Sequence, residues 1–191
     1  MSKIITGILA ALAISAVCTC ASAEIIKKED VVFYTGEDAE LFLYSLNAQY
    51  ETNRTVGYAP SPAEGSQIST DDVPAYDDSI DMRGGEYMES FSLQDNGTYF
   101  SAKPFEVDTG TFMTVYTGQP QGDNNGAFCF SLFALGENGS ETVVYTSPWL
   151  KASDLFVAAA KVNGGSVRYY TEIRRSEAEN TISGNLIYSN Y

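Results

Sequence analysis

The chain has 191 residues, a net charge of −14 at pH 7 and no histidine, and these properties exclude several classes of function. Nucleic acids and anionic membranes are bound by basic surfaces, so the acidic balance argues against both as partners. The lack of histidine removes the Ser-His-Asp triad, the Cys-His pair and histidine-ligated zinc, copper or haem.

Residues 1–23 have the pattern of a signal peptide. Lys3 supplies a positive start, residues 4–17 are uncharged and rich in Ile, Leu and Ala, and Ala21-Ser22-Ala23 matches the small-x-small site of signal peptidase. The apolar run is shorter than the ~20 residues that cross a bilayer. We therefore expect export to the periplasm, the cell surface or the medium, with no membrane span after cleavage and a single domain over residues 24–191.

Cleavage after Ala23 would leave Cys129 as the one cysteine, so no internal disulfide is expected. Cys129 lies in an apolar run, which predicts a small buried hydrophobe. A lipoprotein modified at Cys18 or Cys20 is the weaker alternative, because the residues before them are poor matches to a lipidation site.

Residues 40–50 fit two structures. Alternate residues are apolar, which favours a strand: Phe42, Tyr44, Leu46, Ala48 and Tyr50. The spacing also fits a helix capped by Thr35 or Asp38. The strand is the preferred prediction.

Residues 57–85 contain few apolar side chains to bury. Three prolines interrupt this segment, and its second half carries five aspartates: Asp71, Asp72, Asp77, Asp78 and Asp81. This composition predicts a long, partly disordered acidic loop inserted into the domain.

Short runs rich in Tyr, Phe, Thr and Val, separated by turn residues, predict strands along the rest of the chain. The clearest hairpin joins residues 87–93 to residues 98–102, because Asn96-Gly97 suits a tight primed turn. Residues 127–135 are apolar on both faces and should form a central or covered strand. Further strands are expected at 111–117, 141–146, 154–162, 166–174 and 182–188, with a short helix over 153–162 as an alternative.

The 166–174 segment alternates most clearly. Tyr169 and Ile173 share one face with other apolar side chains, and Tyr170 and Glu172 share the opposite face with arginines, which predicts a half-buried antiparallel strand. Together the segments predict an all-β fold, a two-sheet antiparallel β-sandwich of jelly-roll or immunoglobulin-like kind. The strand order does not follow from the sequence.

Aromatic side chains give the main candidate binding site. The chain has 13 Tyr, 10 Phe and one Trp. Sugars stack on flat aromatic faces while polar neighbours hold their hydroxyls. The candidate ligand-binding residues are Trp149, Tyr145, Tyr170 and Tyr116; for Tyr116 and Tyr99, strand register decides between this face and the core.

Carboxylates supply two weaker candidate sites. Calcium binds clustered carboxylates, and the candidates are Asp71, Asp72, Asp77, Asp78, Asp81 and Asp123, although none has the spacing of a calcium loop. A glycosidase needs two facing carboxyl groups. Glu89, Glu106 and Glu172 lie on predicted strands, but each is expected to be a solvated outer-face residue.

Three functions remain, and the first is preferred. It is an exported, non-catalytic binding or accessory domain with a glycan or cell-surface polymer as ligand and no cofactor. The second is a structural or protein-interaction component of the cell envelope, and the third is a carboxylate-based glycosidase. These rest on fold-level analogy, because fold alone does not define function.

Overall fold

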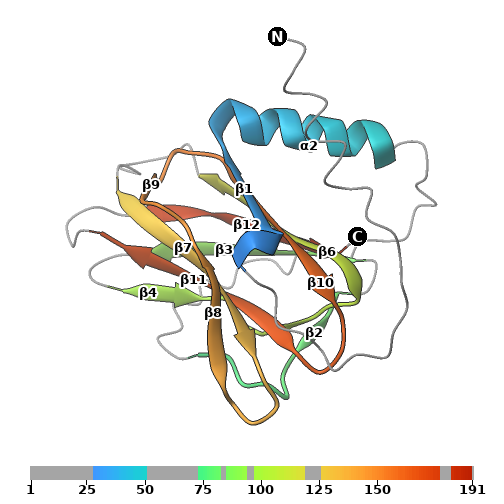
Figure 1. Ribbon diagram of the computed structural model, residues 1–191. Helices are drawn as coiled ribbons and strands as arrows, with labels where there is room; N and C mark the ends of the chain where they lie inside the picture. The colour runs from blue at the N-terminus through green and yellow to red at the C-terminus, as the bar shows by residue number, and fades with distance from the viewer. Residues whose placement is uncertain are drawn as a thin grey trace.

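Two β-sheets packed face to face form the described part of the chain, which comprises residues 28–50, 73–82, 85–93, 97–118, 126–176 and 182–190 of a computed structural model (Figure 1). The predicted all-β, two-sheet sandwich is therefore confirmed. Residues 1–23 of the predicted signal peptide and residues 57–72 of the predicted acidic loop lie outside the described residues.

Sheet A has the strand order β1-β10-β6-β12-β3. In chain order its strands are β1 (Val31–Thr35), β3 (Glu86–Leu93), β6 (Thr109–Gly118), β10 (Phe156–Asn163) and β12 (Ile182–Asn190). A short 3₁₀ turn, η1 (Lys28–Asp30), precedes β1.

Sheet B has the strand order β2-β5-β11-β7-β8, with β4 also paired to β11 and β9 to β7. Among the described ladders β2–β5 is parallel and the others are antiparallel. The strands are β2 (Ile80–Asp81), β4 (Thr98–Phe100), β5 (Phe105–Glu106), β7 (Ala127–Leu135), β8 (Glu141–Thr146), β9 (Leu150–Lys151) and β11 (Arg168–Arg175).

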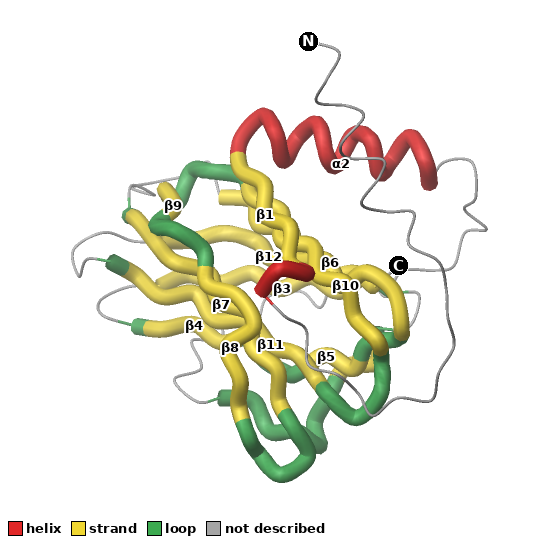
Figure 2. Tube along the Cα trace, viewed as in Figure 1, coloured by secondary structure: helices red, strands yellow, loops and turns green. Residues whose placement is uncertain are grey.

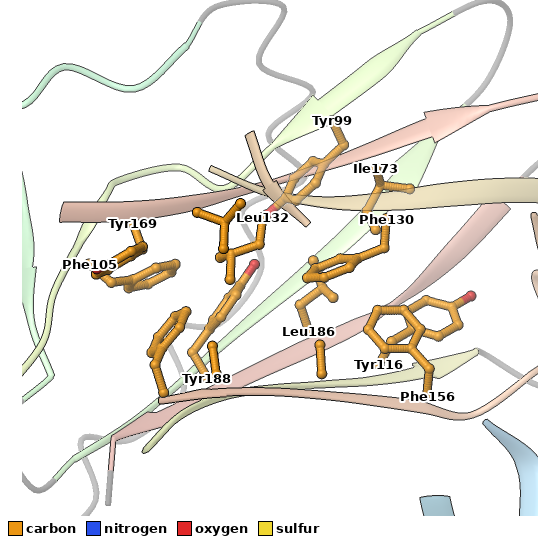
Figure 3. Packing of buried hydrophobic residues seen from close by; sticks show 14 of the residues in the cluster. Tyr99, Phe105, Tyr116, Phe130, Leu132, Phe156, Tyr169, Ile173, Leu186 and Tyr188 are labelled. Carbon is orange, nitrogen blue, oxygen red and sulfur yellow. The ribbon is translucent and has the colours of Figure 1, made fainter. Parts of the chain in front are cut away.

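The space between the sheets is filled mainly by aromatic rings, which come from both layers (Figure 3). Tyr116 of sheet A packs on Phe128 of sheet B with ring centroids 4.8 Å apart. At one margin Phe91 of β3 stacks on Tyr99 of β4, also at 4.8 Å. These contacts show that period-two alternation sorts the large rings into one shared core.

Most predicted strands are confirmed, including β7, which is central in sheet B and buried along nearly its whole length. The predicted 154–162 strand is β10, so the alternative helix over 153–162 does not form. The predicted alternation in β11 also holds, because Tyr169 and Ile173 belong to the inter-sheet core while Tyr170 stacks on the opposite side.

The preferred strand over residues 40–50 is wrong, because this segment belongs to the helix α2 (Gly36–Tyr50). Gly36, at φ 56°, turns the chain out of β1 into the helix. Ala39 is fully buried and Phe42 packs beside it against sheet A, whereas Tyr44 is 76% exposed. The helix therefore uses its i, i+3, i+4 face, and it lies along sheet A beside β1 (Figure 2).

The predicted hairpin between residues 87–93 and 98–102 is also wrong. Strand β3 pairs with β12 in sheet A, whereas β4 pairs with β11 in sheet B. The chain thus crosses from one sheet to the other between these strands. A turn sequence indicates a reversal, but it does not specify which sheet receives the next strand.

Part of the predicted acidic loop, residues 73–82, packs on the sandwich. Met82 is almost fully buried, and Ile80 donates its backbone N–H to the Pro104 carbonyl at 2.8 Å. The Arg168 guanidinium lies 4.0 Å from the centre of the Tyr76 ring and donates a hydrogen bond to the Tyr76 carbonyl. These contacts fix the segment against β5 and β11.

Candidate functional site

The outer face of sheet B, meaning the side turned away from sheet A, collects aromatic and polar side chains. Alternate residues of β7 and of β11 point into the core, so the remaining residues on each of these strands point outward. The outward residues on these strands and their neighbours are Phe100, Ser131, Phe133, Thr146, Tyr170, Glu172 and Arg174.

The centre of this face is an aromatic stack. Tyr170 lies opposite Phe133 in the ladder, and their rings are 4.9 Å apart and inclined by only 5°. Phe100 approaches the Tyr170 ring edge-on at 6.1 Å. Tyr170 is 1% exposed, and burial, followed by the nearby charge of Glu141, raises the pKa of its hydroxyl. Tyr170 therefore supports the face from below, while Phe133 and Phe100 are partly accessible.

Polar groups lie beside the stack. Glu172 faces Ser131 in the ladder, and Ser131 Oγ lies 3.3 Å from Thr146 Oγ1. Burial raises the pKa of Glu172, and Arg174, whose Nε lies 4.0 Å from Glu172 Oε1, lowers it in part. This patch offers carboxylate, hydroxyl and guanidinium groups next to aromatic rings.

Trp149 projects from the β9 margin of sheet B. Its neighbour Leu150 is buried in the core opposite Phe128, whereas Trp149 is 56% exposed. Ser147 fixes the backbone just before it, because its N–H bonds the Phe130 carbonyl at 2.8 Å and its Oγ accepts the Phe130 N–H at 3.0 Å. The backbone is thus fixed two residues before Trp149, and the indole is exposed to solvent.

The structure does not bring the four predicted ligand-binding residues into one platform. Tyr116 is fully buried between the sheets, where its hydroxyl donates to the Ala152 carbonyl at 2.6 Å. Tyr145 is half-buried and packs on Phe33 of sheet A at 5.3 Å. Trp149 is exposed next to β9 at the margin of sheet B, and Tyr170 lies on the outward side of β11. The register also places Tyr99 in the core.

Glu89 is not the solvated outer-face residue that the sequence suggested. It is 7% exposed and lies on the inward face of β3, between Tyr87 and Phe91. The period-two spacing of Tyr87, Glu89, Phe91 and Leu93 was the available signal. Glu106, by contrast, is 37% exposed and 3.5 Å from Arg168, and Glu172 faces outward but is only 13% exposed.

Three tyrosines and one backbone amide surround the Glu89 carboxyl group. Tyr99 and Tyr188 donate their hydroxyls to Oε2, and the Ala102 N–H donates to Oε1 at 3.0 Å. Tyr87 also bonds the carboxyl group. Burial raises the pKa of Glu89 to about 7, although these hydrogen bonds lower it. We call Glu89, Tyr87, Tyr99, Tyr188 and the Ala102 amide the Glu89 cage.

The calcium candidates divide between described and undescribed parts of the chain. Asp71, Asp72 and Asp123 lie outside the described residues. Asp78 forms an ion pair with Lys103 at 2.7 Å. Within the described ranges, no three His, Cys, Asp or Glu side chains gather in a way that could hold a metal ion.

The described helices include none with the length and apolar character needed to cross a membrane. No protein-family model, no curated protein and no solved structure matches this chain. Any functional assignment therefore depends on the geometry of the sandwich.

Proposed function

We propose that this chain is an exported, non-catalytic binding domain that holds a glycan or another cell-surface polymer on the outer face of sheet B. The observation that carries the proposal is the exposed indole of Trp149, at 56% exposure, at the margin of a sheet face built on the Phe133–Tyr170 stack. An exposed indole supplies a flat apolar surface, and the polar side chains of the sheet face supply hydrogen-bonding groups.

The dimensions of the face suit an extended ligand. Neighbouring strands are ~4.8 Å apart and each residue advances ~3.3 Å, so Trp149 and Phe133, the partly exposed ring of the stack, are separated by on the order of 15 Å. Glu172, Ser131 and Thr146 lie in the intervening area. Such a span fits several sugar units, and the net charge of −14 favours a neutral polymer over a polyanionic one.

The test is retention on insoluble polysaccharides and on a glycan array. We expect the chain without residues 1–23 to bind a neutral polysaccharide, and Trp149→Ala to weaken that binding about tenfold or more, as removal of an aromatic anchor does. Tyr44→Ala is the matched control, because Tyr44 is 76% exposed but lies on α2, over the opposite side of the sandwich. Retention on no polymer, or equal losses in both variants, would overturn the proposal.

A protein-interaction component of the envelope is the second candidate. It is favoured by Leu41 and Tyr44, which are 66% and 76% exposed one turn apart on α2. In this case Tyr44→Ala, and not Trp149→Ala, would lose crosslinks in the native envelope. A glycosidase is less well supported, because it needs a second carboxyl group that faces the first. The groups that bond the buried carboxyl group of Glu89 are tyrosine hydroxyls and a backbone amide.

A further inference from the structure

Glu172 lies on the outer face of sheet B, among the rings and hydroxyl groups of the proposed binding face. In the ladders it lies opposite Phe100 of β4 on one side and Ser131 of β7 on the other. Phe133 is two residues further along β7 than Ser131 and is therefore on the same face. Side chains that are opposite or diagonal in a ladder lie within about 8 Å of one another. A sugar ring stacked on Phe100 or Phe133 would therefore have its hydroxyls close to the Glu172 carboxyl group.

The Glu172 carboxyl group is desolvated without being satisfied. Its side chain is only 13% exposed, and among the described residues its Oε1 has no hydrogen-bond partner although it is shut off from solvent. Arg174 Nε lies 4.0 Å from Oε1, which is too long for a hydrogen bond, and the Arg174 side chain is 55% exposed. Burial of a carboxylate in this way lowers stability, because no hydrogen-bond donor replaces the water that it loses.

Glu89 shows how this fold satisfies a buried carboxyl group that supports the structure. Two tyrosine hydroxyls and a backbone amide converge on the two oxygens of Glu89. No such donor reaches Glu172 Oε1 from the part of the chain that the structure describes. A buried polar group that a native protein leaves unsatisfied needs an explanation other than stability. Its position beside partly exposed rings on an open sheet face points to a ligand.

We propose that Glu172 is the hydrogen-bond acceptor that fixes the hydroxyls of a neutral sugar on the outer face of sheet B, and that it is kept there at the expense of stability. This inference rests on the proposed function and names the chemistry that the binding face selects. A carboxylate can accept hydrogen bonds from two neighbouring hydroxyls, and its last torsion is broad, so a small rotation lets both oxygens take part. Thr146, which is exposed, adds a hydroxyl in the same row, beyond Ser131.

The charges around Glu172 favour a neutral sugar over a charged one. Arg174 already supplies a positive charge beside Glu172, so an amino sugar would bring a second cation next to the guanidinium. A uronic acid or a sulfated sugar would bring a negative charge to the Glu172 carboxylate and to a protein of net charge −14. An uncharged hydroxyl donates to the carboxylate without either repulsion.

Stability without any ligand is the first test, because it separates a carboxyl group kept for binding from one that supports the fold. Glu172→Met keeps a side chain of similar length beside Phe100 but removes the unsatisfied acceptor. We expect its midpoint of urea unfolding to be equal to that of the unmodified protein or higher. Glu89→Met is the matched contrast and should lower the midpoint, because it leaves buried donors without their acceptor. A midpoint lowered in Glu172→Met as well would overturn the proposal.

Binding to matched pairs of sugars is the second test. The probes are cellohexaose, mannohexaose and xylohexaose, each beside its fully O-methylated form, which keeps the ring faces but lacks hydroxyl donors. We expect the unmodified protein to bind at least one free form about tenfold more tightly than its methylated form, and Glu172→Met to lose that preference. Glu37→Gln is the matched control, because Glu37 is exposed on α2, over the opposite sheet, and it should keep the preference.

The outcomes separate this inference from the proposed function. If Trp149→Ala weakens binding and Glu172→Met keeps the preference for free hydroxyls, the role of Glu172 is wrong while the proposed function stands. Equal binding of free and methylated sugars by the unmodified protein would have the same meaning. If the unmodified protein binds none of the sugars and no polysaccharide, the proposed function and the role of Glu172 fail together.

Discussion

The side chain of Tyr116 packs on sheet A beside a pair of glycines, Gly118 and Gly184, which lie opposite each other on neighbouring strands. A Cβ atom on Gly184 would lie 2.3 Å from the Tyr116 ring and 2.9 Å from the Thr117 carbonyl oxygen. Its ladder partner Gly118 faces the Ala152 carbonyl, the acceptor of the Tyr116 hydroxyl, and a Cβ there would lie 2.2 Å from that oxygen. The two glycines thus provide the space for the ring and its hydrogen bond.

Gly184→Ala should therefore destabilise the protein by about 1–3 kcal/mol, as overpacking of a well-filled core does. The midpoint of urea unfolding, followed by circular dichroism, measures this loss. Gly85→Ala is the matched control, because a Cβ at Gly85 would meet no atom within 4 Å, and its effect should stay within about 0.5 kcal/mol. Equal losses in the two variants would show that Tyr116 does not depend on Gly184.

At the same residue scale, alternation predicted the direction of side chains better than their accessibility. Tyr170 was assigned correctly to the outward side of β11, yet it is 1% exposed because Phe133 and Phe100 pack on it. These neighbours come from other strands, and strand order was not predictable from the sequence. For Glu89 the prediction of direction was wrong. Its spacing with Tyr87 and Phe91 fits the inward face of β3, but it was expected to lie on the outer face because acidic residues are usually solvated.

At the scale of elements, α2 shows why local pattern could not decide between strand and helix. Phe42 and Leu46 fit both periods, and the outer face of sheet A decided the outcome. That face presents apolar side chains from β6 and β10, which the inward face of α2 covers: Met113, Val115, Val157 and Ala159. Tertiary burial overrides a weak local preference in such a segment.

If this burial stabilises α2, two neighbouring residues of the helix should respond differently to truncation. Phe42 stacks on Tyr34 with ring centroids 4.8 Å apart, so Phe42→Ala should lower the free energy of unfolding by about 2–4 kcal/mol. Leu41 is 66% exposed, so Leu41→Ala should change stability by less than about 0.5 kcal/mol. Denaturant unfolding of the two variants checks the difference, and a loss of similar size in Leu41→Ala would mean that the helix packs by another face.

At the scale of the whole molecule, stability should fall as pH rises toward neutrality. The other carboxylates, part of a net charge of −14, repel one another more strongly as they ionise. Glu89 acts in the same direction, because its pKa is raised in the folded protein and the unfolded chain gives up the proton first. Its contribution is fully present below about pH 4.5 and is lost as pH rises to about 7.

A shift from 4.5 to about 7 corresponds to about 3 kcal/mol. The free energy of unfolding of the unmodified protein should therefore be higher at pH 5 than at pH 8, and Glu89→Gln should remove about 3 kcal/mol of that difference. Glu137→Gln should keep it, since Glu137 is exposed. If Glu89→Gln retained the full difference, surface repulsion alone would account for the pH dependence, and folding would not raise the pKa of Glu89.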